Sequence, residues 1–158
     1  ARTFLRKSNE YAISILYHRC TVFVSFYYIM ILLFGILAGL ITFAIGGLWY
    51  GLIFRDAWIE ASGIDMAKVE ADRQAGKNGQ KEMMISLAIE VVTAVVAIFF
   101  IKTLDVSPLH AAGGMGVTAV LASLKNYVFE QRPIKLILIN ESYKLVCYLV
   151  VGIIALFA

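Results

Sequence analysis

The sequence predicts an all-α, polytopic integral membrane protein with four transmembrane helices in one bundle, preceded by an amphipathic or stalk-like N-terminal helix. Of its 158 residues, 61% are hydrophobic and 16% are charged, whereas soluble domains average ~45–50% apolar and ~25% charged residues. The mean hydropathy is +0.82. A soluble domain of this length cannot bury so much apolar surface, because its surface-to-volume ratio is high. The composition also excludes disordered, collagen-like, coiled-coil and disulfide-rich secreted proteins.

Four apolar runs are long enough to cross the ~30 Å hydrocarbon core of a bilayer, which takes about 20 helical residues. The first, residues 21–54, contains no charge, and its length requires a tilt or an extension beyond the core. The other three are residues 83–101, 108–128 and 133–158, which hold only isolated charges. All four are predicted to be helices, because a spanning segment must satisfy its own backbone polar groups. Residues 20–158 thus form one predicted membrane domain.

Two segments lie outside these runs. Residues 1–19 mix basic and apolar side chains, which predicts an amphipathic helix at the membrane surface or a stalk that extends the first span. We favour a surface helix over an arm that docks on a partner. Residues 55–82 form a polar connection with five Lys/Arg and six Asp/Glu. Its run 65–73 favours a helix that Gly76 or Gly79 would end.

Small residues spaced four apart indicate where helices can pack closely. The pairs are Gly35 and Gly39, Gly47 and Gly51, and Ala112 and Gly116. Such spacing lets neighbouring helix backbones approach one another. It therefore supports a packed bundle or an oligomer.

Four polar residues of the second and fourth spans are predicted to gather: Glu90, Asn140, Glu141 and Lys144. Ionised groups inside a bilayer normally face the bundle interior or one another. Counting ~1.5 Å per residue from the span entries places Glu90, Glu141 and Lys144 in one layer. We expect Glu90 to pair with Lys144, or to share it with Glu141. The favoured role is an ion pair that fixes helix register; the alternative is a proton or ion relay, or a polar substrate site.

Aromatic residues gather near the polar connection: Trp49, Tyr50, Trp58, Tyr127 and Phe129. Anchoring at the membrane interface is the ordinary role of such a belt. A pocket for a quinone or a lipid headgroup, beside Glu130 and Arg132, is the alternative. We expect Glu130 and Arg132 to pair with each other or with residues 55–82, ahead of Pro133, which opens the last span. No metal site and no resident cofactor are predicted, because His and Cys residues do not recur at ligand spacing.

Two stretches resemble a known family. The first is the Gly-Leu-Trp-Tyr sequence that starts at Gly47, followed by Phe54 and Trp58; the second is Phe-Glu-Gln-Arg-Pro, from Phe129 to Pro133. Together they resemble the small four-span membrane proteins catalogued as domain of unknown function 1761, over about residues 35–158. The resemblance implies a fold and a topology and no activity. Glu90, Glu141 and Lys144 are not part of the resembling pattern.

The functional expectation is a non-catalytic accessory or structural subunit of a larger membrane complex, such as a respiratory or ATP-synthase-type assembly. One alternative is a small oligomeric ion or solute transporter or channel that uses the Glu/Lys layer, and another is a lipid or quinone binder. Catalytic motifs are lacking, and no basic cluster indicates nucleic acid.

Expected partners are membrane lipids and other subunits or copies of the chain. The start at Ala1 fits methionine removal or transit-peptide cleavage, so the bacterial and mitochondrial inner membranes are both expected locations.

Overall fold

The computed structural model describes the backbone of residues 2–77 and 79–158, and the side chains of Arg19 and of residues 21–77 and 79–158. All regular structure in these residues is helical, which confirms the all-α part of the predicted fold class. The elements are α1 (Arg2–Leu48), the π-helix η1 (Trp49–Ile53), α2 (Arg55–Ser62), α3 (Met66–Gln74), α4 (Gln80–Thr103), α5 (Pro108–Phe129) and α6 (Ile134–Ala155).

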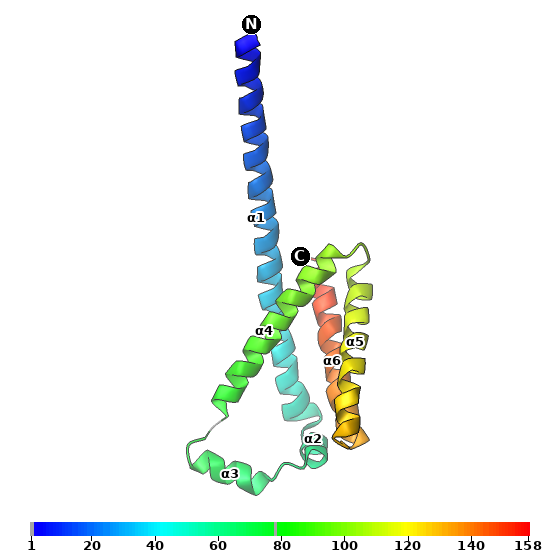
Figure 1. The fold of residues 1–158 in the computed structure, drawn as a ribbon. Helices are drawn as coiled ribbons and strands as arrows, with labels where there is room; N and C mark the ends of the chain where they lie inside the picture. The colour runs from blue at the N-terminus through cyan, green and yellow to red at the C-terminus, as the bar shows by residue number, and fades with distance from the viewer. Residues whose placement is uncertain (1, 78) are drawn as a thin grey trace.

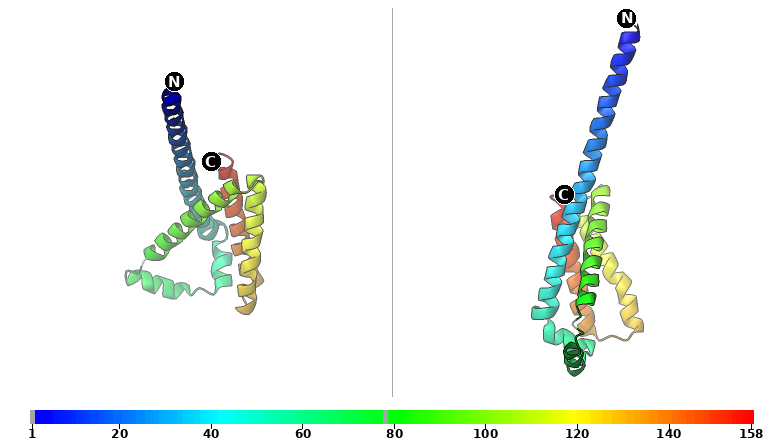
Figure 2. Two further views of the ribbon diagram at one scale, coloured as in Figure 1. Left: turned by 45° about the horizontal axis from the view of Figure 1, so that its top comes forward. Right: turned by 90° about the vertical axis from the view of Figure 1, so that its left-hand side faces the viewer.

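The long helices form two packed pairs, α1 with α4 and α5 with α6, and α6 also contacts α1 and α4. Figures 1 and 2 show α2 and α3 together at one end of this bundle, which we call the connection end. The turn between α4 and α5 and the C-terminus lie at the opposite end, the terminal end (Figure 1). Both ends of the chain therefore lie at the terminal end, as an even number of predicted spans requires.

Three helical stretches are long and apolar enough to cross a membrane: Thr21–Ile53, Gln80–Thr103 and Ile134–Ala155. The expectation of four such spans is wrong for α5, which is not among them although it has 22 residues. Its three glycines and its polar residues, such as Ser123 and Lys125, lower its average hydropathy. The bounds of the last three predicted runs agree with α4, α5 and α6 to within three residues, whereas α1 begins at Arg2, well before the first predicted run.

The N-terminal segment is continuous with the first span. One uninterrupted helix, α1, runs from Arg2 to Leu48, so the predicted boundary at residue 19 is not a break in the backbone. Figure 1 shows α1 extending well past the other helices at the terminal end. Whether residues 1–19 lie at a membrane surface or extend the first span as a stalk stays a prediction. The predicted amphipathic character of residues 1–19 concerns side chains that, apart from Arg19, lie outside the described ones.

Glycine allows α1 and α4 to cross in close contact. A Cβ added at Gly39 would lie 2.4 Å from the Cα of Val91, and one added at Gly35 would lie 2.6 Å from the Cα of Val95. Real Cβ atoms do not approach backbone so closely, so only glycine fits at either position. This confirms the packing predicted for the Gly35/Gly39 pair.

The Ala112/Gly116 pair also lies at a helix interface, whereas the Gly47/Gly51 pair does not. Ala112 is fully buried, and a Cβ added at Gly152 of α6 would lie 2.6 Å from the Ala112 Cβ. Gly116, one turn further along α5, is buried as well. By contrast, a Cβ added at Gly47 or Gly51 would meet no described atom within 4 Å. The Gly47/Gly51 spacing therefore marks no contact within the described chain.

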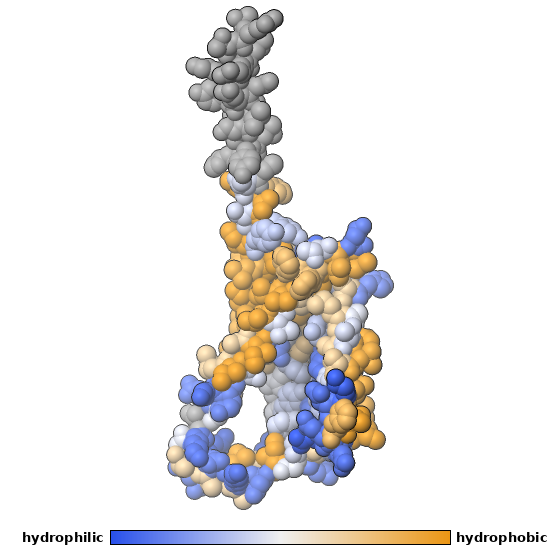
Figure 3. Space-filling view, viewed as in Figure 1, coloured by the Kyte–Doolittle hydropathy of each residue, from blue (hydrophilic) through white to orange (hydrophobic). Residues whose placement is uncertain are grey.

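Alanine and isoleucine dominate the apolar core, where the four long helices meet. Its buried members are Ile31, Ala38, Ala94, Ala97, Ile98, Ile101, Ala111, Ala112, Val151 and Ala155. The first third of α4 does not contribute, because every side chain from Gln80 to Ser86 is exposed. Figure 3 shows the result, an opening enclosed by this part of α4, by α3 and by α1.

Local signals fix the ends of the shorter elements. The Asp65 carboxylate caps α3 by accepting from the backbone amides of Ala67 (2.9 Å) and Lys68 (3.3 Å), which satisfies two unpaired donors of the first turn. Gly76, just past the end of α3, has φ 83°, a left-handed conformation that glycine adopts at no steric cost. The helix predicted at 65–73 and its glycine end are thus confirmed.

Candidate functional site

A single π-helical turn shapes the connection end of α1. The Phe54 amide donates to the Trp49 carbonyl five residues earlier, at 2.8 Å. π-turns are rare in proteins and occur frequently at functional sites. Here the turn directs Trp49 toward α6, where its indole nitrogen donates to the Ile139 carbonyl at 3.1 Å. The wider turn therefore connects the end of the first span to the last helix.

The aromatic residues around this turn form a compact group, which we call the aromatic cluster: Trp49, Tyr50, Phe54, Trp58 and Tyr143. The Tyr50 ring lies 5.4 Å from that of Trp58 and 5.2 Å from that of Tyr143. The Trp49 ring lies 4.8 Å from Phe54 and 6.2 Å from Tyr143. These are ordinary separations for favourable aromatic pairs. The structure thus brings Trp49, Tyr50 and Trp58 together, as predicted.

Two other aromatic residues of the predicted belt lie on α5 and have different surroundings. The Tyr127 hydroxyl accepts a hydrogen bond from the Asn140 amide at 3.1 Å. Phe129 is 82% exposed at the end of the helix. An exposed phenylalanine at a helix end suits a position at a membrane interface.

Glu90 is surrounded by hydroxyl groups, and we call this arrangement the Glu90 site. Thr42 Oγ1 of α1 lies 3.3 Å from Glu90 Oε2, and the Tyr143 hydroxyl of α6 lies 3.0 Å from Glu90 Oε1. Each hydroxyl also lies 3.1 Å from a backbone carbonyl, that of Gly39 for Thr42 and that of Thr42 for Tyr143. Three helices therefore meet at one carboxyl group.

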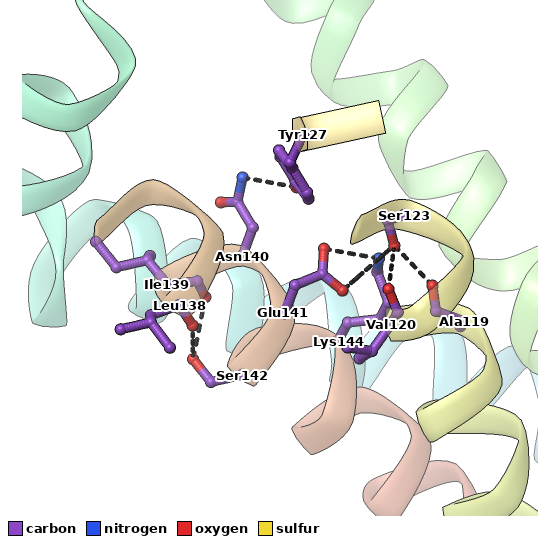
Figure 4. Close-up of polar contacts among 10 residues, drawn as sticks. All are labelled: Ala119, Val120, Ser123, Tyr127, Leu138, Ile139, Asn140, Glu141, Ser142 and Lys144. Carbon is purple, nitrogen blue, oxygen red and sulfur yellow. Dashed lines mark hydrogen bonds and ion pairs between the residues drawn. The ribbon is translucent and has the colours of Figure 1, made fainter. Parts of the chain in front are cut away.

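A second polar group, the Lys144 network, lies between α5 and α6 (Figure 4). The Lys144 ammonium lies 2.8 Å and 3.0 Å from the two carboxylate oxygens of Glu141, and it also donates to the Ser123 hydroxyl. The Ser123 hydroxyl in turn lies 3.3 Å from Glu141 Oε2. The Glu141 side chain is 7% exposed and that of Lys144 is 30% exposed. This is a largely buried ion pair with an additional hydrogen-bond partner.

The predicted pairing of Glu90 with Lys144 is wrong. Glu90 accepts from Thr42 and Tyr143, while Lys144 pairs with Glu141. Successive residues of an α-helix point about 100° apart, so Tyr143 faces α1 and α4 whereas Lys144 faces α5. Asn140, Glu141 and Lys144 do share one side of α6, as their spacing predicts. The ionised groups that were expected in one layer therefore form two separate sites, which lie on different sides of α6.

The turn between α5 and α6 carries an exposed ion pair. Arg132 Nε lies 2.8 Å from Glu130 Oε2, with the two side chains 46% and 55% exposed, which confirms their expected pairing. Pro133 follows in an extended conformation and caps α6. Because the two charges neutralise each other at an exposed turn, their arrangement does not favour a headgroup pocket.

An ion pair that the sequence did not indicate joins α2 to α6. Lys135 Nζ lies 2.5 Å from Glu60 Oε2, and both side chains are largely exposed. The hydrogen bond and the charge of Lys135 hold the pKa of the Glu60 carboxyl below its ordinary value. This pair attaches the polar connection to the start of the last helix.

The pH dependence of this attachment follows from the lowered pKa. The link stabilises α2 on α6 above the ordinary glutamate pKa of ~4.3, and it is lost as the pH falls through the lower pKa of the folded state. Amide hydrogen exchange in α2 should therefore accelerate at pH 3 relative to pH 7, after correction for intrinsic rates. In Glu60→Gln, exchange should be faster at pH 7 and should lack this acid-induced increase. Equal acid sensitivity in both proteins would contradict the assignment.

These observations define a class of protein: a small helical bundle whose helices suit a membrane crossing and whose polar side chains meet inside it. A family model described as "Protein of unknown function (DUF1761)" matches residues 33–156. The chain belongs to this family, as its Gly-Leu-Trp-Tyr and Phe-Glu-Gln-Arg-Pro stretches predict. No curated protein and no solved structure matches the chain.

Proposed function

We propose that this chain is an integral protein of a bacterial or mitochondrial inner membrane and a non-catalytic structural subunit of a larger membrane complex, of respiratory or ATP-synthase type. In this proposal α1, α4 and α6 cross the bilayer, and α5 packs on α6. Lys144 and Asn140 face the polar residues of α5, so α5 shields them from lipid.

The length of the apolar part of α1 is the observation that carries the assembly role. At ~1.5 Å per residue, the stretch Thr21–Ile53, with 33 residues, is about 50 Å long. The corresponding stretches of α4 and α6, with 24 and 22 residues, are about 36 and 33 Å long. Even at the ~40° upper limit of helix tilt, 50 Å of helix spans ~38 Å, against a core of ~30 Å. The apolar stretch of the first helix is therefore longer than the thickness of the membrane core that α4 and α6 fit.

The excess lies at the terminal end, where α1 leaves the bundle. The ring of Tyr28 stacks on that of Phe99 of α4 at 6.5 Å, and α1 continues from there toward its N-terminus without α4 beside it (Figure 1). Val22, Phe23 and Phe26 are 57%, 80% and 63% exposed in this region. Burying such side chains stabilises by about 25 cal/mol per Å² of apolar surface. Packing against a helix of another subunit would bury these exposed side chains.

The assembly role predicts a large native complex. Solubilised in mild detergent from its native membrane, the protein should migrate on a native gel as an assembly far larger than its 17.5 kDa. The double variant Phe23→Ala/Phe26→Ala should leave that assembly while keeping the thermal stability of the bundle. A matched control is Leu149→Ala/Ile153→Ala, which removes similarly exposed side chains from α6 and should stay assembled.

Two results would refute the role. One is wild-type protein that migrates only as a monomer or a simple homodimer. The other is a Phe23→Ala/Phe26→Ala variant that remains in the native assembly as fully as the α6 control does.

A further inference from the structure

We propose that the Glu90 site binds one small monovalent cation, a sodium ion. The proposal does not depend on the assembly role, because it rests on contacts within the bundle. It begins with the number of hydrogens that Thr42 and Tyr143 can donate. Each hydroxyl has a single hydrogen but lies within reach of two acceptors, one oxygen of Glu90 and one backbone carbonyl.

The paired acceptors allow two hydrogen-bond arrangements with the same atom positions. In the first, both hydroxyls donate to Glu90 and stabilise a bare carboxylate. In the second, they donate to the carbonyls of Gly39 and Thr42, which turns hydroxyl lone pairs toward the carboxyl group. That second arrangement has the oxygen ligands that hard cations prefer. The site can therefore exist with and without a bound positive charge.

Space for a ligand adjoins the carboxyl group. A cavity of about 20 Å³ is lined by Glu90, Thr42 and Thr93, and by Cys147 and Tyr148 of α6. A cavity of this size holds one particle as large as a water molecule, given polar partners in its wall. The threonine hydroxyls and the carboxylate supply those partners on one side. The cavity is too small for an organic substrate, which limits the ligand to an ion or water.

No basic side chain neutralises Glu90 in the described part of the chain. The nearest intramembrane cation on α6, Lys144, is engaged by Glu141 and Ser123. The titratable groups that interact with Glu90 are the phenols of Tyr143 and Tyr148 and the thiol of Cys147, together with the phenol of Tyr50. None of these types carries a positive charge in any state. A bound cation would remove the cost of an unpaired carboxylate within a membrane.

The start of α4 does not pack on α1. Side chains from Gln80 to Ser86 are exposed, and close packing of α4 on α1 begins at Val91, next to Glu90. Figure 3 shows an opening beside this first part of α4. Glu90 therefore lies where the packed part of the α1–α4 interface begins.

Infrared spectroscopy of the purified full chain in nanodiscs tests the proposal. The Glu90 band is assigned by subtracting the spectrum of Glu90→Gln from that of the wild type, with sodium chloride or choline chloride at equal concentration. A sodium site predicts a Glu90 carboxylate band that shifts when sodium replaces choline, and this result supports the proposal.

The matched control is Glu141→Gln, which removes the other carboxyl of α6 and should leave the assigned band and its response unchanged. Thr42→Val should weaken binding of the ion about five- to tenfold, because one hydroxyl contact is lost. If Glu90→Gln does not fold, Tyr143→Phe assigns the band instead by shifting it. The proposal is overturned by a Glu90 carboxylate band that is the same in sodium and choline, or by the lack of a Glu90 carboxylate band in both salts.

Discussion

Replacing Gly39 with leucine is expected to force α1 and α4 apart and to cause the largest loss of stability of any single change in this bundle. The new Cβ would lie 2.4 Å from the Cα of Val91 and 2.9 Å from its Cγ2 and its amide nitrogen. Because most of these atoms belong to a helix backbone, rotation of one side chain cannot relieve the clash. Overpacking in a tight interface typically costs about 1–3 kcal/mol and occasionally more, and we expect about 3 kcal/mol or more here.

The measurement is the unfolding midpoint of the full chain in detergent, followed by the fluorescence of Trp49 and Trp58. Gly35→Leu should reproduce the effect, since its Cβ would lie 2.6 Å from the Cα of Val95. The matched control is Gly47→Leu, which adds the same atoms to α1 where no described atom lies within 4 Å. Similar losses at Gly39 and Gly47 would show that a general effect of the larger side chain on α1, rather than the α1–α4 crossing, determines the result.

Helix positions were predictable because they depend on local composition. The uncharged run from Thr21 reaches Ile53 as one apolar stretch, and Ser107 caps α5 with Pro108 at its first position, as both residue types favour. The span predicted for α5 was wrong because its three glycines, His110 and Lys125 lower its mean hydropathy below that of the three apolar stretches. Its packing on α6, rather than its own hydropathy, explains its place in the bundle.

The partners of Glu90 were not predictable, because they depend on how three helices rotate about their axes. Spacing placed Lys144 on the side of α6 that holds Asn140 and Glu141, and this was correct. It could not show that α5, and not α4, packs on that side. Tyr143, one residue earlier, faces Glu90 instead. The uncharged Thr42 gave no signal within an apolar run, and the π-turn at Trp49 has no known sequence signature that would have revealed it.

Replacing Lys144 with methionine should also strongly destabilise the bundle, because it leaves Glu141 without its cation. The Glu141 side chain is 7% exposed, and its oxygens lie 2.8 and 3.0 Å from the lysine nitrogen. Removing one partner of a buried ion pair costs about 3–5 kcal/mol. We expect a value near 3 kcal/mol, because Lys144 is 30% exposed and water or Ser123 can partly solvate the remaining carboxylate. The same unfolding measurement in detergent applies.

A double-mutant cycle separates the cost of an unpaired charge from the value of the pair. Glu141→Leu/Lys144→Met should recover most of the lost stability, because an apolar pair of similar volume often replaces a buried ion pair without loss. Lys135→Met breaks the exposed pair with Glu60 and should change stability too little to resolve. A double variant as unstable as Lys144→Met would mean that the pair itself stabilises the bundle. A stable double variant that still joins its native assembly would instead show that neither the stability of the bundle nor its assembly requires the ion pair.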